Sequence, residues 1–242
     1  MSILVVGGSK GIGRATCLRF APGNDVFVNC HSDVRAGEAT VEAVQDAGGR
    51  GHLVVGDVGT PEGAAQVLKQ VAGHTDHLHQ VVHCAVDPLS APLLEVDLDD
   101  FTSSVQVSGL SLLYVVRAAL DLLRAGSSVF FLSSLGSKRV VPGYGAIGSA
   151  KSLAESLVRY LSVELAPRGV RVNTVSSGPL DTDAYRAAFS NAAERLAVAA
   201  RNNPSRRPLT TDDVAALIWL LASEDAELVQ GQEVRVDGGL YL

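Results

Sequence analysis

The stretch Ser2-Ile-Leu-Val-Val-Gly-Gly-Ser-Lys-Gly-Ile-Gly13 decides the fold of this 242-residue chain. Residues 3–6 are apolar and have the length of a buried strand. The glycine-rich turn follows at once and opens a helix, so small residues stand where backbone N–H groups can approach and face a pyrophosphate. A plain tight turn is the alternative interpretation. The position at the first strand–helix junction favours a nucleotide site.

Short β-branched runs recur along the chain, separated by helix-length segments rich in Ala, Leu, Glu and Arg. The runs occupy residues 3–6, 26–28, 53–55, 81–82, 129–132, 170–175 and 234–236. Several are apolar on both faces, as buried parallel strands are. The alternation predicts an α/β fold with one Rossmann-type domain over residues 1–242, built on a doubly wound parallel sheet of about seven strands.

One segment departs from this alternation. Within residues 181–208, Ala-rich helical sequence is followed by Asn-Asn-Pro-Ser-Arg-Arg-Pro, which continues a helix poorly. We therefore predict an excursion from the sheet that closes over a substrate.

Charge and cysteine usage exclude several classes of partner. The net charge is −6, and the Lys and Arg residues are scattered, which argues against a nucleic acid or an anionic membrane as partner. The three cysteines are widely spaced with no CxxC arrangement, which fits a reducing cytoplasm. The sequence begins with a strand, has no basic leader and contains no membrane-length apolar stretch. We expect a soluble cytoplasmic protein.

A phenol and an ammonium group stand seven residues apart in Tyr144-Gly-Ala-Ile-Gly-Ser-Ala-Lys151. Two helical turns separate them, and helical side chains lean toward the N-terminus, so Lys151 on one helix with Tyr144 would reach back toward its ring. Pro142 and Gly143 mark the helix entrance. Ser134 stands at the end of a predicted strand. This combination favours reductive chemistry beside a nucleotide over a loop tyrosine and a solvated lysine.

The end of the second predicted strand decides between the two nicotinamide cofactors. It contains Asn29-Cys30-His31-Ser32, and no carboxylate occurs before Asp33 to hold a ribose 2′-hydroxyl. Lys10 in the glycine turn can face a 2′-phosphate, so NADPH is favoured over NADH. Asp57, after the third strand, is placed either to accept from the adenine amine or to cap a helix that begins near Thr60.

Four motifs together resemble the short-chain dehydrogenase/reductase superfamily over essentially the whole chain. They are GGSKGIG at 7–13, the Ser134, Tyr144 and Lys151 set, SGPLDT at 177–182 and VDGG at 236–239. The commonest branch places its Tyr four residues before the Lys, where this chain has Ile147. Tyr-x6-Lys is the spacing of the enoyl-acyl-carrier-protein reductases. Residues 133–165, with a Ser ten residues before the Tyr, are most similar to their NADPH-dependent type III enzymes.

The chain departs from the superfamily pattern at two places. The usual Asn-Asn-Ala-Gly after the fourth strand is His83-Cys84-Ala85-Val86, and Gln106 matches the Asn of the proton relay in carbonyl-reducing members. These differences weaken the case for a hydroxyl relay to bulk water. We expect His83 and Cys84 to line the cofactor cleft rather than to form a catalytic pair.

The resemblance implies roles for three residues in the reduction of a trans-2-enoyl thioester. Hydride would pass from the nicotinamide to the β-carbon, and Tyr144 would donate a hydrogen bond to the enolate oxygen. Lys151 would hold the nicotinamide ribose, and Ser134 would steady the carbonyl or the phenol. No donor is assigned to the α-carbon. The expected cofactor-binding residues are Gly7, Ser9, Lys10, Gly11, Ile12, Gly13, His31, Ser32, Asp57, Val58, Cys84, Ala85, Lys151, Gly178, Leu180 and Thr182.

The sequence is compatible with three functions. The first is an NADPH-dependent enoyl-thioester reductase of fatty-acid or polyketide biosynthesis, acting on a substrate carried by an acyl carrier protein or coenzyme A. The second is a ketoreductase in a specialised pathway, and the third is a non-catalytic NADPH-binding regulatory subunit.

Two further expectations concern assembly and metals. The resemblance implies a homotetramer built on helices near 101–124 and 145–166. A zinc site at His74, His77 and His79 is disfavoured because no cysteine is close to them, so no metal is expected.

Overall fold

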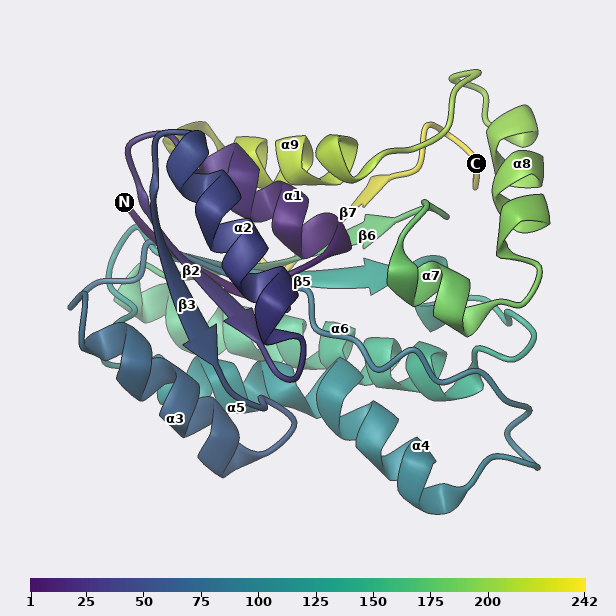
Figure 1. The fold of residues 1–242 in the computed structure, drawn as a ribbon, viewed down its shortest axis with the longest axis horizontal. Coiled ribbons are helices and arrows are strands. Elements are labelled where there is room, and N and C mark those ends of the chain that lie inside the picture. The colour runs from purple at the N-terminus through teal and green to yellow at the C-terminus, as the bar shows by residue number, and fades with distance from the viewer.

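Seven parallel strands form one sheet through the centre of the computed structural model, which describes residues 1–242 (Figure 1). The strands are β1 (Ser2–Val6), β2 (Asp25–Cys30), β3 (Arg50–Val55), β4 (Gln80–His83), β5 (Ser128–Ser134), β6 (Arg171–Ser177) and β7 (Glu233–Val236). Their order is β3-β2-β1-β4-β5-β6-β7. Each predicted apolar run overlaps one strand, so the doubly wound sheet is confirmed. The chain reverses direction across the sheet between β1 and β4, where such folds bind ligands.

Helices cover both faces of the sheet. One face carries α1 (Gly11–Phe20), α2 (Val34–Asp46) and α9 (Thr211–Ala222), and the other carries α3 (Pro61–Ala72), α4 (Leu98–Val105), α5 (Ser111–Ala118) and α6 (Gly145–Leu165) (Figure 1). Side chains alternate along β1, so Ile3 belongs to the core beneath α1 and Leu4 to the core beneath α3, α5 and α6. Short 3₁₀ turns occupy Leu135–Ser137, Ala166–Arg168 and Glu224–Ala226.

The long helix expected near 101–124 is wrong as a continuous element. A π-helical turn, η1 (Gln106–Leu110), separates α4 from α5, and α5 ends at Ala118. A Cβ on Gly109 would lie 2.6 Å from the Ala150 carbonyl oxygen, so the two helices approach at backbone contact. Ser108 in the same turn accepts a hydrogen bond from the Asp87 N–H at 2.9 Å. Tertiary contacts therefore favour the widened turn over a regular helix.

The helix of Lys151 begins at Gly145, as the range near 145–166 predicts, but it does not include Tyr144. Tyr144 is the residue immediately before α6, so it is not inside the helix, although its carbonyl accepts the Gly148 N–H at 2.7 Å. Gly143 has a φ of +76°, which turns the chain into the helix as the Pro-Gly pair indicates. The phenol is thus carried by the junction of a loop and a helix.

Residues 181–208 contain two short helices, α7 (Asp183–Ala188) and α8 (Ala192–Asn202). Both lie beyond the carboxyl ends of the strands, and the C-terminus runs beside α8 (Figure 1). Thr182 caps α7, and Arg186 pairs with Asp181 at 2.7 Å. None of the helices in this fold combines the length and the apolar character needed to cross a bilayer.

Candidate active site

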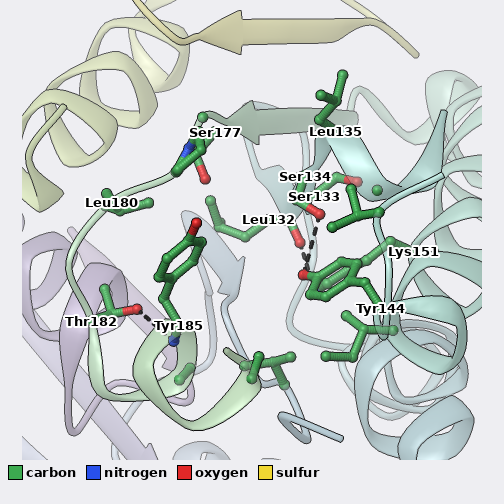
Figure 2. Close-up of a pocket in the computed structure, with 18 of the residues that line it drawn as sticks. Leu132, Ser133, Ser134, Leu135, Tyr144, Lys151, Ser177, Leu180, Thr182 and Tyr185 are labelled. Carbon is green, nitrogen blue, oxygen red and sulfur yellow. Dashed lines mark hydrogen bonds between the residues drawn. The ribbon is translucent and has the colours of Figure 1, made fainter. Parts of the chain in front are cut away.

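A pocket opens at the carboxyl ends of the central strands, between α6 and the α7 segment (Figure 2). Its walls include eight of the predicted site residues, Ile12, Cys84, Ser134, Tyr144, Lys151, Gly178, Leu180 and Thr182. These residues follow four different strands or belong to α6. The parallel sheet brings them together because its strands all end at the same edge.

Ser134 and Tyr144 form a hydrogen-bonded pair in this pocket. The Ser134 hydroxyl donates to the Tyr144 hydroxyl at 3.3 Å (Figure 2). Gly136 packs against the phenol ring so closely that a Cβ there would lie 2.4 Å from ring atom Cδ1. Burial raises the pKa of Tyr144. The phenol is therefore protonated at neutral pH and can donate a hydrogen bond. Its position is fixed by the hydrogen bond from Ser134 and by the close contact with Gly136.

Lys151 is buried on the inner face of α6, with 4% of its surface exposed. Its Nζ donates to the Leu132 carbonyl at 2.7 Å and lies 4.5 Å from the centre of the Phe131 ring. Burial lowers the pKa of Lys151 to about 8. An ammonium has three donors, so two remain for a ligand in the pocket. The side chain is anchored on β5 beside Ser134, rather than bonded to Tyr144.

The glycine turn after β1 fits a pyrophosphate. Gly7 has a φ of +72°, and a Cβ on Gly13 would lie 2.1 Å from the Gly7 carbonyl oxygen, so only glycine lets the turn close this tightly. Lys10 is the N-cap residue of α1 and makes no side-chain cap hydrogen bond. The first N–H groups of α1 are therefore free of side-chain acceptors and face the cleft as an anion site.

Lys10 has a partner that the sequence did not predict. Its Nζ lies 2.5 Å from Asp33 Oδ2 and 4.0 Å from Asp183 Oδ2 of α7. Asp33 also caps α2 by accepting the Ala36 N–H at 3.1 Å. His31 and Ser32 are exposed beside this pair. At the end of β2, the carboxylate of Asp33 and the ammonium of Lys10, which comes from the glycine turn, therefore offset each other's charge.

The structure shows how Asp57 and Val58, after the third strand, and Ala85, after the fourth strand, are placed. Thr60, not Asp57, caps α3, so the capping interpretation of Asp57 is wrong; Asp57 accepts the Gly59 N–H at 2.8 Å instead. The side chain of Val58 packs in the core with 4% exposed, which leaves only its backbone for a cofactor. The Ala85 backbone lies against Gly7, where a Cβ would approach its nitrogen to 2.9 Å.

The expectation that His83 lines the cleft is wrong, whereas Cys84 does line the pocket. His83 is fully buried, and its Nε2 lies 2.7 Å from Ser111 Oγ. Because Ser111 donates its own proton to the Val107 carbonyl at 2.6 Å, His83 is the donor in this pair. Burial lowers the pKa of His83 to about 3 and raises the pKa of Cys84 to about 12. Both groups are neutral at physiological pH.

Several pocket residues were not predicted. Tyr185, Phe189 and Arg195 come from the α7–α8 segment, and Tyr241 comes from the C-terminal end of the chain. The Tyr144 and Phe189 rings are stacked with centres 5.7 Å apart, and Arg195 lies 4.0 Å from the Phe189 ring centre. Residues 181–208 depart from the strand–helix pattern, and this signal could have pointed to Tyr185, Phe189 and Arg195.

The histidines of the disfavoured zinc site lie at the opposite end of the sheet. His77 and His79 stack with centres 4.0 Å apart, and His74 packs against His52 at 4.6 Å. No group of three histidine, cysteine or acidic side chains is arranged to hold a metal ion. Gln106 does not line the pocket either.

Comparison with known proteins agrees with this geometry. Residues 6–241 match the family model described as enoyl-(acyl carrier protein) reductase. The 1-cyclohexenylcarbonyl-CoA reductase of Streptomyces collinus is 32% identical over 99% of this chain and 86% of that protein. The NADH enoyl-acyl-carrier-protein reductase 2 of Rhizobium meliloti (strain 1021) is 31% identical over 76% of this chain and 69% of that protein.

Solved structures share the same fold. A short chain dehydrogenase from Burkholderia cenocepacia J2315, crystallised in complex with NADP, superposes with a TM-score of 0.90 at 26% identity, covering 99% of this chain and 97% of that one. The family match spans nearly the whole chain, including the glycine turn and the Tyr144 and Lys151 pair. This protein is therefore an oxidoreductase that belongs to the enoyl-(acyl carrier protein) reductase-like family of the short-chain dehydrogenase/reductase superfamily.

Proposed function

We propose that the protein is an NADPH-dependent reductase of the 2,3 double bond of an enoyl thioester. The observation that carries this proposal is the Tyr144 hydroxyl, held by Ser134 at 3.3 Å inside a mainly apolar pocket. Its raised pKa keeps the phenol protonated, as a donor to a developing oxyanion must be. The Tyr-x6-Lys spacing and the matched family model support enoyl over carbonyl reduction.

The chain has groups suited to each part of NADPH. The N-terminus of α1 would hold the pyrophosphate, Lys151 the nicotinamide ribose, and Lys10 the 2′-phosphate once it leaves Asp33. The nicotinamide, when bound, supplies a hydride to the β-carbon. The NADP in the Burkholderia structure supports this preference, whereas the Rhizobium relative is an NADH enzyme.

Tyr144 and its neighbours would act on the thioester oxygen. Negative charge develops on this atom when the β-carbon is reduced, and a hydrogen bond from Tyr144 stabilises that charge. A preorganised donor of this kind contributes about 3 kcal/mol in other enzymes. Phe189 and Ile147 help to exclude water from the pocket, which strengthens the contact. Ser134 keeps the phenol oriented.

The substrate we propose is an acyl or polyketide thioester carried by coenzyme A or an acyl carrier protein in a biosynthetic pathway. The names of both curated relatives support a thioester, one as a CoA derivative and one bound to acyl carrier protein. We also propose assembly into a homotetramer through α6. The exposed Tyr160 and Val163 on this helix, at 68% and 74%, support an interface there.

Absorbance of NADPH at 340 nm tests the function directly. Consumption with crotonyl-CoA and none with acetoacetyl-CoA is the expected result, and the reverse pattern would identify a ketoreductase instead. NADPH binding without turnover of either thioester would indicate the regulatory subunit. Tyr144→Phe should lower the enoyl activity by about 150-fold, whereas Tyr114→Phe, a matched change on α5 outside the pocket, should leave it unchanged.

A further inference from the structure

A second phenol faces the pocket from the wall opposite Tyr144. Tyr185 is carried by α7 and lines the pocket, with its ring across the opening from Tyr144 (Figure 2). Its hydroxyl makes no hydrogen bond to the protein; only its backbone N–H does, to Thr182. The hydroxyl is thus free to donate to a ligand that lies between the two rings.

The position of Tyr185 is fixed by its neighbours. Thr182 Oγ accepts the Tyr185 N–H at 3.1 Å and caps α7. The Tyr185 ring packs against Phe189 with centres 4.8 Å apart, and Phe189 in turn stacks on Tyr144. A side chain held by a helix cap and an aromatic partner keeps its hydroxyl directed into the pocket, which a catalytic group requires.

Reduction of an enoyl thioester needs a second proton donor. Once the β-carbon has received hydride, the α-carbon of the enolate still requires a proton, and Tyr144 is already committed to the oxygen. Ser133 donates to Glu155 at 2.5 Å, and Lys151 is committed to the Leu132 carbonyl and, in the proposed function, to the nicotinamide ribose. Ser177 and Thr182 also line the pocket but carry only alkyl hydroxyls. A phenol, with an ordinary pKa of about 10, is far more acidic than an alkyl hydroxyl. Tyr185 and Tyr241 remain as candidates.

Their positions relative to the reacting phenol separate these two tyrosines. Phe189 stacks on Tyr144 with ring centres 5.7 Å apart, and the Tyr185 ring packs against the same Phe189 at 4.8 Å. Tyr185 is therefore joined to the reacting end of the pocket through one shared aromatic ring. Tyr241 shares the pocket wall with Arg195, on the α8 side.

We propose that Tyr185 is a second catalytic residue, which donates its hydroxyl proton to the α-carbon of the enolate held by Tyr144. The proposal depends on the enoyl-reductase function proposed above. The enolate electron pair forms the new C–H bond, the Tyr185 O–H bond breaks, and the thioester carbonyl is restored. Tyr185 is only partly buried, so the phenolate regains a proton from solvent water. Overall, the substrate gains one hydride from NADPH and one proton from water.

Deuterium labelling distinguishes this role from a structural one. In D₂O with crotonyl-CoA and unlabelled NADPH, the wild-type enzyme should place one deuterium at the α-carbon in a single configuration, measured by NMR of the product. Tyr185→Phe should lower kcat by about 100-fold, the lower end for loss of a general acid, and yield both configurations because water then protonates the enolate. Its Kd for NADPH and its melting temperature should match those of the wild type.

Matched single-oxygen deletions make the outcomes distinct. Tyr114→Phe, a control on α5 outside the pocket, should keep wild-type kcat and configuration. A single α-configuration and wild-type kcat in Tyr185→Phe would overturn the proposal while leaving the enoyl-reductase function intact. Mixed configurations in Tyr241→Phe but not in Tyr185→Phe would also overturn it. Failure of the wild type to reduce any enoyl thioester would instead refute the proposed function, and this role with it.

Discussion

A single methyl group at Gly136 should disable the site without unfolding the protein. In Gly136→Ala the new Cβ would lie 2.4 and 2.6 Å from Cδ1 and Cε1 of the Tyr144 ring, far inside van der Waals contact. The backbone of Gly136 is not in the left-handed region, so alanine fits its conformation. The ring must therefore move, and the Ser134 contact, already 3.3 Å long, is lost with it.

The expected fall in kcat follows from the loss of the hydrogen bond that Tyr144 donates to the developing oxyanion. A hydrogen bond to a developing oxyanion contributes about 3 kcal/mol. Each 1.36 kcal/mol changes a rate tenfold, so kcat should fall by about 150-fold. The cost in unfolding free energy should be smaller, about 1 kcal/mol, because a partly exposed ring can move aside.

The assay is NADPH consumption with crotonyl-CoA, together with thermal unfolding. Gly73→Ala serves as the matched control: Gly73 ends α3 with a φ of −67°, and a Cβ there meets only carbonyl oxygens of α3, none closer than 3.3 Å. Combining Gly136→Ala with Tyr144→Phe should add no further loss, because both changes remove the same contact. Wild-type kcat in Gly136→Ala, or a fully additive double variant, would refute this reasoning.

Three other perturbations have defined outcomes. Burial lowers the pKa of Lys151 from 10.5 to about 8, so NADPH affinity measured by fluorescence should fall as pH rises through 8. The unfolding free energy should rise between those two pKa values, where the native state has already released the proton that the unfolded state keeps. Lys10→Ala should raise the Kd for NADPH about tenfold and leave that for NADH unchanged. Lys138→Met leaves the buried Glu155 carboxylate without its cation, and urea titration should show a loss of about 2 kcal/mol.

Features that depend on local sequence could be predicted well. The seven strands were found because buried parallel strands need continuous apolar runs, and the turn at 7–13 was found because its glycines are needed for close backbone contacts. The meeting of Ser134, Tyr144 and Lys151 followed from the resemblance and from the rule that parallel strands end at one edge.

Features that depend on partners distant in the chain could not be predicted. The π-helical turn at Gln106–Leu110 accompanies backbone contact between Gly109 and Ala150, which no local pattern records. The pairing of Lys10 with Asp33 joins residues 23 positions apart. His83 was misplaced because a strand end can point its side chain either into the cleft or into the core, and alternation alone does not say which.

The pocket draws residues from both extremes of the chain, since Ile12 and Tyr241 line it together. Lys138, four residues after Ser134, also forms an ion pair with Glu233 on the edge strand β7. On the ribosome, a nascent polypeptide can form the glycine turn early, but the pocket stays incomplete until residues 233–241 have emerged. A copy that lacks residues 233–241 has an incomplete pocket wall, so we expect it to be unable to oxidise a reduced nicotinamide.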